Sequence, residues 1–350
     1  MSAPNTKVET KPAVLREAMM KRVNRRMVAQ GSLVLPAAPG LLDAYTELLA
    51  TQFRILGRAL TTDEQAHLRR ILSDKLDEAY FGSPFSRLRV TWGTDAPPAV
   101  SLSYVVTVIH STMESEYEEW TRTREPPLFG ANPDAKVMDV ARSLGAPASV
   151  RCLDIGAGTG RNTIPLAREG FKADAVEAAP ALIKLLQDGI ASEKLDIRVF
   201  EGDVLGAKIE LPRAHYQLVF LCEVLSHFRD LEGVKKLFAR AADTLAPGGV
   251  LLFSAFIAHD SYTLDKLARE LSQVFWSTVF TRKELATAME GLPFERVSDE
   301  SVHAYEKEHL PPTAWPPTGW FSEWTQGQDV FALPEGKCPT ELRWIAYQRA

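Results

Sequence analysis

The sequence contains little cysteine and no long apolar stretch. Its three cysteines, Cys152, Cys222 and Cys338, are too few and too widely spaced for a disulfide framework or a metal site. No apolar run approaches the roughly 20 residues that span a bilayer, and the polar start of the chain, Met1 to Pro12, lacks the apolar core of a signal peptide. These absences predict a cytoplasmic protein with reduced thiols, no metal and no membrane association.

The chain also lacks an excess of basic charge. The formal net charge of its 350 residues is −5, whereas proteins that bind nucleic acids usually carry a basic stripe. Apolar residues make up 45% and charged residues 24%, which is ordinary for a globular protein, and the length suits two domains. The charge disfavours a nucleic acid as partner, and we expect a small molecule or a peptide instead. Separately, we expect the protein to be a monomer or a homodimer.

A strand, a glycine turn and a helix follow one another near the middle of the chain. Val150 to Ile155 is an apolar run typical of a buried strand, and the helix begins near Arg161. Between them stand Gly156, Gly158 and Gly160. Glycines allow tight turns and let a ligand approach the backbone, so this corner predicts a binding site for a nucleotide-like ligand.

Two residues of this corner disfavour a dinucleotide. Arg161 stands where the dinucleotide fingerprint has a small residue that packs the helix on the strand. Asp154 lies at the tip of the strand, where its charge would repel a diphosphate. An acid there suits a ligand with a positive charge, such as S-adenosylmethionine, which carries a sulfonium and an ammonium and no phosphate.

The stretch from Cys152 to Gly160 resembles the first motif of class I S-adenosylmethionine-dependent methyltransferases. Further features of that family follow in order over residues 150–255: acids after the second and third strands, a fourth strand followed by Glu223-Val-Leu-Ser-His227, and a Pro-Gly-Gly turn before the fifth strand. The resemblance implies a seven-stranded sheet of order 3-2-1-4-5-7-6, with helices on both faces and an antiparallel last strand.

The resemblance also implies a set of cofactor-binding residues. Glu177 ends the second strand, where a carboxylate can accept the two ribose hydroxyls, and Asp203 matches the acid that bonds the adenine amino group in the family. The full set is Asp154, Gly156, Ala157, Gly158, Gly160, Asn162, Glu177, Ala178, Gly202, Asp203, Val204, Cys222 and Glu223. The product would be S-adenosylhomocysteine.

We predict three parts in the chain. Residues 1–12 are expected to be disordered, residues 13–147 to form a helical cap with a β-hairpin and a lid segment, and residues 148–350 to form the methyltransferase domain. An insertion at 307–340 separates the last two strands. Loops of this length are usually functional or disordered, so we expect the insertion to serve as a cap or a dimer contact.

The predicted reaction is an in-line displacement at the methyl group. His227 is a candidate general base because imidazole titrates near neutrality, although a purely structural role is equally compatible with its position. Candidate lid or substrate residues are Tyr117, Trp120, Arg124, Trp315, Trp320 and Trp324. Two alternatives remain open: an NAD-dependent oxidoreductase, and a non-catalytic protein of this fold that binds S-adenosylmethionine.

Overall fold

The computed structural model describes residues 8–95 and 101–350. It divides into two compact units, Met1–Thr112 and Met113–Ala350. The division comes earlier than our expected boundary between residues 147 and 148, so helices α4 (Met113–Thr123) and α5 (Ala135–Ser143) belong to the second unit. Most of the predicted disordered tail, residues 1–12, lies outside the described residues. Among the helices described, none is long and apolar enough to span a membrane.

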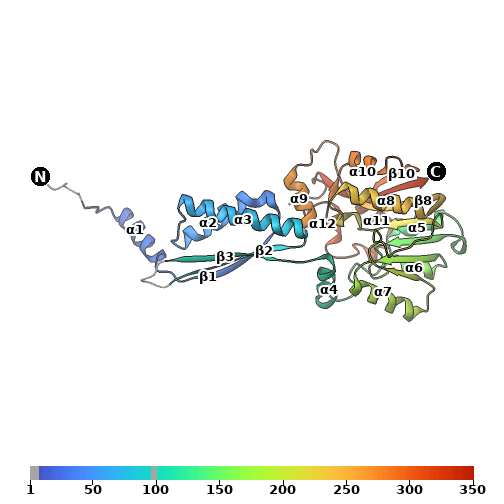
Figure 1. The fold of residues 1–350 in the computed structure, drawn as a ribbon, viewed down its shortest axis with the longest axis horizontal. Helices are drawn as coiled ribbons and strands as arrows, with labels where there is room; N and C mark the ends of the chain where they lie inside the picture. The colour runs from blue at the N-terminus through green and yellow to red at the C-terminus, as the bar shows by residue number, and fades with distance from the viewer. Residues whose placement is uncertain (1–7, 96–100) are drawn as a thin grey trace. The chain divides into compact units, whose positions relative to one another are not determined.

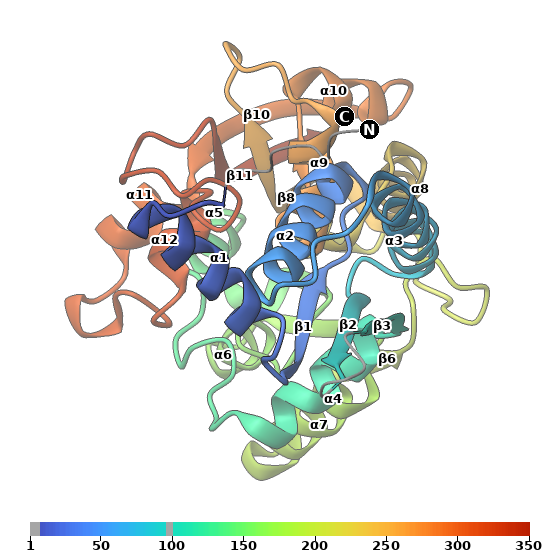
Figure 2. The same ribbon diagram turned by 90° about the vertical axis from the view of Figure 1, so that its left-hand side faces the viewer.

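The first unit is a three-stranded antiparallel sheet covered on one face by two helices (Figures 1 and 2). Its strands are β1 (Gln30–Pro36), β2 (Arg87–Thr94) and β3 (Leu102–Ile109), and its helices are α2 (Leu42–Ile55) and α3 (Thr62–Gly82). The predicted hairpin is the β2–β3 pair. Leu88, Val90 and Val106 alternate with exposed residues and pack against the helices. The helix α1 (Pro12–Asn24) buries none of its residues.

The second unit is built on one mixed sheet with the strand order β10-β11-β8-β7-β4-β5-β6. In chain order these are β4 (Arg151–Ile155), β5 (Lys172–Glu177), β6 (Arg198–Glu201), β7 (Tyr216–Leu221), β8 (Leu245–Ala258), β10 (Phe294–Ser301) and β11 (Thr340–Arg349). The strand β11 is antiparallel to both of its neighbours. The predicted order 3-2-1-4-5-7-6 with an antiparallel last strand is therefore confirmed.

Side-chain alternation along the central strands separates two helical layers. On β7, Val219 and Leu221 face the cluster that contains α8 (Leu231–Thr244) and α10 (Arg282–Met289). Leu218 and Phe220 face the opposite cluster, which contains α5 and α6 (Thr163–Arg168). Because both faces are covered, the strands are nearly continuous in apolar residues, as in other parallel sheets.

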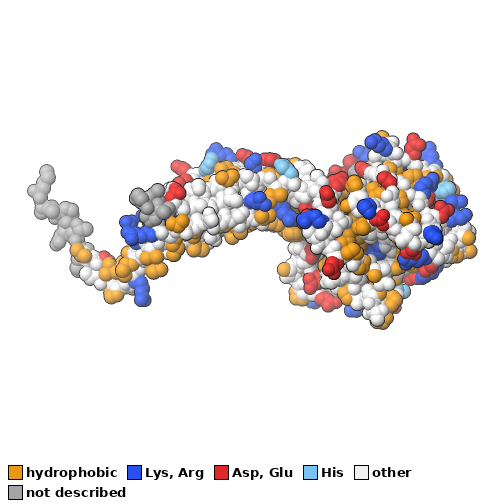
Figure 3. Space-filling model, turned by 90° about the horizontal axis from the view of Figure 1, so that it is seen from below, with side chains coloured by type: hydrophobic (Ala, Val, Ile, Leu, Met, Phe, Trp, Pro, Cys, Tyr) orange, Lys and Arg blue, Asp and Glu red, His pale blue; other side chains and the backbone are white. Residues whose placement is uncertain are grey.

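The remaining elements lie at the ends of the strands. The helix α7 (Pro180–Glu193) follows β5, the short helix η3 (Leu225–His227) follows β7, and α9 (Lys266–Val274) leads to β9 (Val279–Phe280), which pairs with β8. Figure 3 shows acidic and basic side chains interspersed over the visible surface of the second unit. The concentrated charge of this unit is instead found in its interior, around the glycine turn.

The insertion is folded and not a loose loop. It contains the end of α11 (Val302–His309), the turn η4 (Pro312–Ala314) and α12 (Phe321–Thr325). Trp324 is 6% exposed and packs edge-on against Phe256 of β8, with 5.0 Å between ring centroids. Trp320 packs on Trp324, and Trp315 packs on Phe321. This packing buries Trp324 in the apolar cluster beside the sheet and places Trp315 and Trp320 against it. The role of the three tryptophans as lid or substrate residues stays a prediction.

Candidate functional site

The glycine turn lies where β4 ends, at the carboxyl edge of the parallel strands. Gly156, Gly158 and Gly160 all have positive φ angles, of 77°, 59° and 88°. A side chain at Gly156 would meet Val224, and one at Gly160 would meet Leu186, both closer than 3.0 Å. At Gly158 the nearest neighbour would be the ring of Phe129, at 3.6 Å. The turn therefore requires glycine for its conformation at all three positions and for space at two.

Glu177 is tied to the glycine turn by its side chain. It ends β5, is 6% exposed, and its Oε2 accepts a hydrogen bond of 2.7 Å from the N–H of Gly158. Its Oε1 accepts from the N–H groups of Ala178 and Ala179, at 2.9 and 2.8 Å. Burial raises the pKa of Glu177, and these three hydrogen bonds act against that rise. The carboxylate is thus fixed in the corner that the turn forms.

Asp154 lies beneath the turn. Only 2% of it is exposed, and its Oδ2 accepts a hydrogen bond of 2.6 Å from the hydroxyl of Thr163. Burial raises the pKa of Asp154 to about 7. The charged form is therefore costly in this structure, because one hydroxyl does not replace the hydration that a buried carboxylate loses.

Arg161 joins two further acids beneath the turn. Its guanidinium contacts Oδ1 of Asp134 at 2.5 Å and Oε1 of Glu223 at 3.2 Å. Asn162 adds two bonds to Asp134: its Nδ2 donates to the carboxylate, and its Oδ1 accepts from the backbone N–H. Asn162 also donates to the Sγ of Cys222 at 3.4 Å. Asn162 therefore links Asp134 to Cys222 by side-chain hydrogen bonds.

Glu223 follows β7 in a strained conformation. Its φ is +64°, which is uncommon for a residue with a side chain. The backbone is held on both sides, because the N–H donates to Ser254 Oγ at 2.7 Å and the carbonyl accepts from the hydroxyl of Ser226. Burial raises the pKa of Glu223 to about 7, although Arg161 opposes the rise. Strain held in this way is typical of functional sites.

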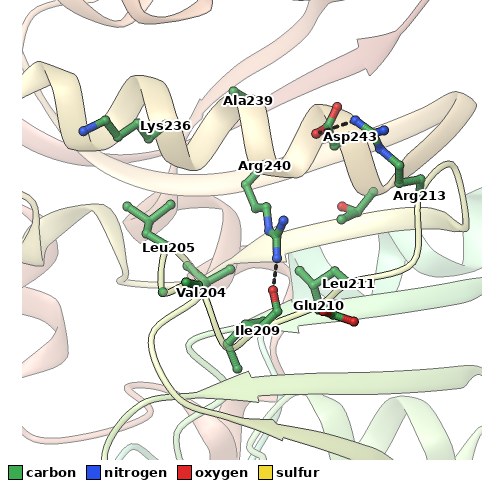
Figure 4. Close-up of a pocket in the computed structure, with 13 residues that line it drawn as sticks. Val204, Leu205, Ile209, Glu210, Leu211, Arg213, Lys236, Ala239, Arg240 and Asp243 are labelled. Carbon is green, nitrogen blue, oxygen red and sulfur yellow. Dashed lines mark hydrogen bonds and ion pairs between the residues drawn. The ribbon is translucent and has the colours of Figure 1, made fainter.

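The loop after β6 supplies the outer edge of the corner. The N–H of Gly202 donates to the carbonyl of Glu177 at 2.7 Å, and Asp203 is exposed, with Oδ1 accepting from the N–H of Leu205. Val204 is buried and lines a hollow of about 580 Å³ between this loop and α8. Figure 4 shows Arg240 reaching across this hollow to the carbonyl of Ile209. Val204 is therefore part of the loop's own core.

Five rings form an aromatic box over the glycine turn: Tyr117, Trp120, Phe129, His227 and Trp276. Tyr117 is central, with ring centroids 5.5 to 6.2 Å from the other four. Trp120 and Trp276 stack with 5.0 Å between centroids. The guanidinium of Arg124 lies 3.8 Å over the ring of Trp120. Phe129 connects the box to the turn through its approach to Gly158.

A hydrogen bond lies at the centre of the box. The hydroxyl of Tyr117 and Nε2 of His227 are 3.1 Å apart. Burial lowers the pKa of His227 to about 4 and raises that of Tyr117, on which Glu177 and Glu223 act in the same direction. At neutral pH both side chains are therefore uncharged, and the phenol can donate to the imidazole.

The structure thus brings together most of the predicted residues. Tyr117, Trp120 and Arg124 lie with His227, while Asp154, Glu177 and Glu223 lie around the glycine turn. Three residues of this region were missed by sequence reasoning: Asp134, Phe129 and Trp276. Asp134 directly precedes the helix α5. In a sequence, an acid at that position is most simply explained as a helix N-cap. Trp276, with a φ of +59°, stands in the turn after α9, and only the fold brings it to His227.

Comparison with known proteins agrees with this architecture. A family model described as a methyltransferase domain matches residues 118–298, more than half of the chain. The ubiquinone biosynthesis O-methyltransferase of Azorhizobium caulinodans is 28% identical over 165 residues, which cover 44% of this chain and 62% of that protein. Its counterpart from Xanthomonas axonopodis pv. citri is 30% identical over 135 residues, or 37% and 52%. The chain spans little more than half the length of these relatives.

A solved structure supports the fold. The phosphoethanolamine N-methyltransferase 2 of Haemonchus contortus, determined with phosphomonomethylethanolamine and S-adenosylhomocysteine, aligns with a TM-score of 0.50 at 15% identity. The alignment covers 71% of this chain and 63% of that one. The family match, the strand order and the glycine turn at the end of β4 lead to one conclusion: the chain belongs to the methyltransferase domain family.

Proposed function

We propose that the chain transfers the methyl group of S-adenosylmethionine to a small-molecule acceptor. The observation that carries this proposal is the charge around the glycine turn. Four largely buried carboxylates, of Asp134, Asp154, Glu177 and Glu223, surround the turn, and the described ion pairs give them one partner, Arg161. Buried charges are stable only when they are paired, so the corner favours a ligand that brings positive charge.

S-adenosylmethionine fits this requirement. Its sulfonium and ammonium groups are cationic, and the sulfonium carries the electrophilic methyl group. The pyrophosphate of NAD would instead add negative charge to four acids. Glu177 suits the ribose hydroxyls because it lies at the end of the second strand. Asp154 and Glu223 suit the cationic end of the ligand, and the exposed carboxylate of Asp203 suits the adenine amino group.

His227 is the residue we propose as general base. Its imidazole is neutral at physiological pH because burial lowers its pKa to about 4. Its Nε2, which lies 3.1 Å from the Tyr117 hydroxyl, has the lone pair that a general base needs, and the same burial makes the imidazole a weak base until the bound reactants stabilise its charge. The half-buried rings of the aromatic box limit the access of water to it, which strengthens electrostatic interactions at the reacting atoms. The protein's main contribution is otherwise to position the two reactants.

Titration calorimetry of the full chain tests the binding part of the proposal. We expect S-adenosylmethionine to bind and NAD to give no saturable heat, because the corner holds an excess of carboxylates. The double variant Asp154→Asn and Glu223→Gln should bind S-adenosylmethionine more weakly, since both amides keep the size of the acids and remove their charge. Tighter binding of NAD than of S-adenosylmethionine would overturn the proposal.

The affinity for S-adenosylmethionine should rise with pH. Asp154 and Glu223 have pKa values raised to about 7, so each loses its proton between pH 6 and pH 8 and becomes able to pair with the cation. We expect roughly a tenfold gain in affinity over this range for each acid. S-adenosylhomocysteine, which lacks the sulfonium charge, should gain less and serves as the control ligand.

The same two acids should have the opposite effect on the free protein. Their pKa values in the folded state exceed those of an unfolded chain, so the folded state binds more protons between about pH 4 and 7 and loses stability as the pH rises through that range. The cofactor-induced increase in melting temperature should therefore be larger at pH 8 than at pH 6. Equal affinities and equal thermal shifts at both pH values would contradict the role of these acids.

A further inference from the structure

We infer that Tyr117 occupies the acceptor subsite, and that the acceptor is a phenol whose hydroxyl takes the place of the Tyr117 hydroxyl at Nε2 of His227. The inference rests on the proposed function and names its substrate class. The centre of the aromatic box already holds one phenol, the side chain of Tyr117. Its hydroxyl is hydrogen-bonded to the proposed base His227 at 3.1 Å. The box around Tyr117 therefore shows the environment that a phenolic ring would find there.

The shape of the box suits a flat ring. Tyr117 is contacted edge-on by Trp120, Phe129, His227 and Trp276, with interplanar angles of 68° to 87°. Edge-to-face contacts of this kind are favourable for aromatic rings beyond the area they bury. A saturated ligand of the same size would forgo them, so the walls select for an aromatic acceptor.

The box also adjoins the cofactor corner. Phe129, which contacts Tyr117, lies against the glycine turn at Gly158. Tyr117 and Phe129 further belong to an apolar cluster with Ala179 and Leu182, directly after the ribose-binding candidate Glu177. A phenol in this place would therefore lie beside the corner that is proposed to hold the methyl donor, with its oxygen at His227.

Tyr117 lies on a helix that can move away from the aromatic box. It belongs to α4, a helix of 11 residues that buries none of them fully and follows directly on the boundary between the two units at Thr112. Elements with few buried residues are the ones that open locally at low cost. Movement of α4 would withdraw Tyr117 together with Trp120, which lies on the same helix, and would leave Phe129, His227 and Trp276 in place.

The reaction that follows is balanced. The phenol oxygen forms a bond to the methyl carbon as the carbon–sulfur bond breaks, and that electron pair returns to sulfur. The phenolic proton passes to Nε2 of His227. The products are an aryl methyl ether, S-adenosylhomocysteine and a proton held by the imidazole until solvent removes it.

The test uses p-cresol, which reproduces the side chain of tyrosine beyond Cβ. In the full-length Tyr117→Ala variant, p-cresol should bind the vacated box without any cofactor, about fivefold more tightly than toluene, because the hydroxyl bonds to His227. The preference over toluene should vanish in Tyr117→Ala with His227→Ala. With S-adenosylmethionine added, the single variant should convert p-cresol to 4-methylanisole.

A second variant keeps the test decisive if Tyr117→Ala does not fold. Tyr117→Phe fills the box but releases Nε2, so α4 should open more easily and p-cresol should bind a few-fold more tightly than it does to the unaltered protein. Unchanged or weaker binding to both folded variants would overturn the inference. A tenfold loss of S-adenosylmethionine affinity in Tyr117→Ala without p-cresol binding would assign Tyr117 to the cofactor site instead. The proposed function would still stand in both cases, since it fails only if the unaltered protein does not bind S-adenosylmethionine in preference to NAD or transfers no methyl group from it.

Discussion

Replacing Gly158 by valine should abolish binding of S-adenosylmethionine. We expect a loss of affinity of more than about a hundredfold, or roughly 3 kcal/mol. The φ of Gly158 is +59°, a region that costs a residue with a side chain about 1–2 kcal/mol and a β-branched one more. The N–H of Gly158 also holds Glu177, so a shift of the turn would displace the candidate ribose ligand. Calorimetry with S-adenosylmethionine measures the loss.

The matched control is Gly291→Val. Gly291 also has a positive φ, of 79°, and a side chain there would meet nothing within 4 Å. This variant therefore carries comparable backbone strain away from the glycine turn. It should lose stability in a thermal melt and keep its affinity for the cofactor. If Gly158→Val is folded and binds S-adenosylmethionine as well as Gly291→Val does, the glycine turn is not the site.

Replacing His227 by alanine should reduce kcat with a phenolic acceptor by about 10²–10⁴-fold, the usual contribution of a general base. The affinity for S-adenosylmethionine should stay unchanged, because His227 belongs to the aromatic box and not to the acidic corner. In the unaltered enzyme kcat should be insensitive to the ionisation of His227 above about pH 5, since burial lowers its pKa to about 4. Steady-state kinetics between pH 5.5 and 8 measure both parameters.

His215→Ala is the control for this variant. His215 directly precedes β7 and His227 follows it, so the two histidines lie at opposite ends of the same strand. The control should retain full activity. A fall in kcat of the same size in both variants would indicate that loss of packing, not loss of a base, explains the effect. An unchanged kcat in His227→Ala would exclude His227 as the base.

The sequence predicts the sheet well because its strands carry their own signals. Apolar runs such as Cys152 to Ile155 are ended by glycine or by an acid, and the order of these features follows the order of the chain. The carboxyl ends of parallel strands meet at one edge of the sheet, so Asp154, Glu177 and Glu223 could be expected to lie together. Their placement around the turn follows from strand order alone.

The environment of those acids could not be predicted in the same way. Glu177 accepts three backbone hydrogen bonds, and backbone geometry of this kind is fixed only when β5 and the glycine turn are packed together. Arg161 provides a second example. In the sequence it is simply a residue that does not fit a dinucleotide fingerprint, while in the structure it pairs with Asp134 and Glu223 beneath the turn.

The aromatic residues show where pattern reasoning fails. Phe129 and Trp276, which the sequence did not predict, come from segments far apart in the chain. They join the predicted residues Tyr117 and Trp120 only because α4, the loop after it and the end of α9 converge on η3. Trp324 differs from these residues. Its place in the insertion predicted a cap or a dimer contact, and in the structure it is buried against Phe256 of β8. Whether a tryptophan serves the core or a site depends on tertiary contacts that periodicity does not encode.

Transfer of a labelled methyl group from S-adenosylmethionine is the most direct test of whether the protein methylates a small molecule. The full-length protein is incubated with the methyl-labelled cofactor and a panel of small phenols, amines and carboxylic acids, and both S-adenosylhomocysteine and labelled products are quantified. We predict label in a small molecule, with one S-adenosylhomocysteine formed for each methyl group transferred and no transfer by Gly158→Val. Binding of S-adenosylmethionine without transfer to any member of the panel or of a metabolite extract would contradict it and indicate a non-catalytic binding protein.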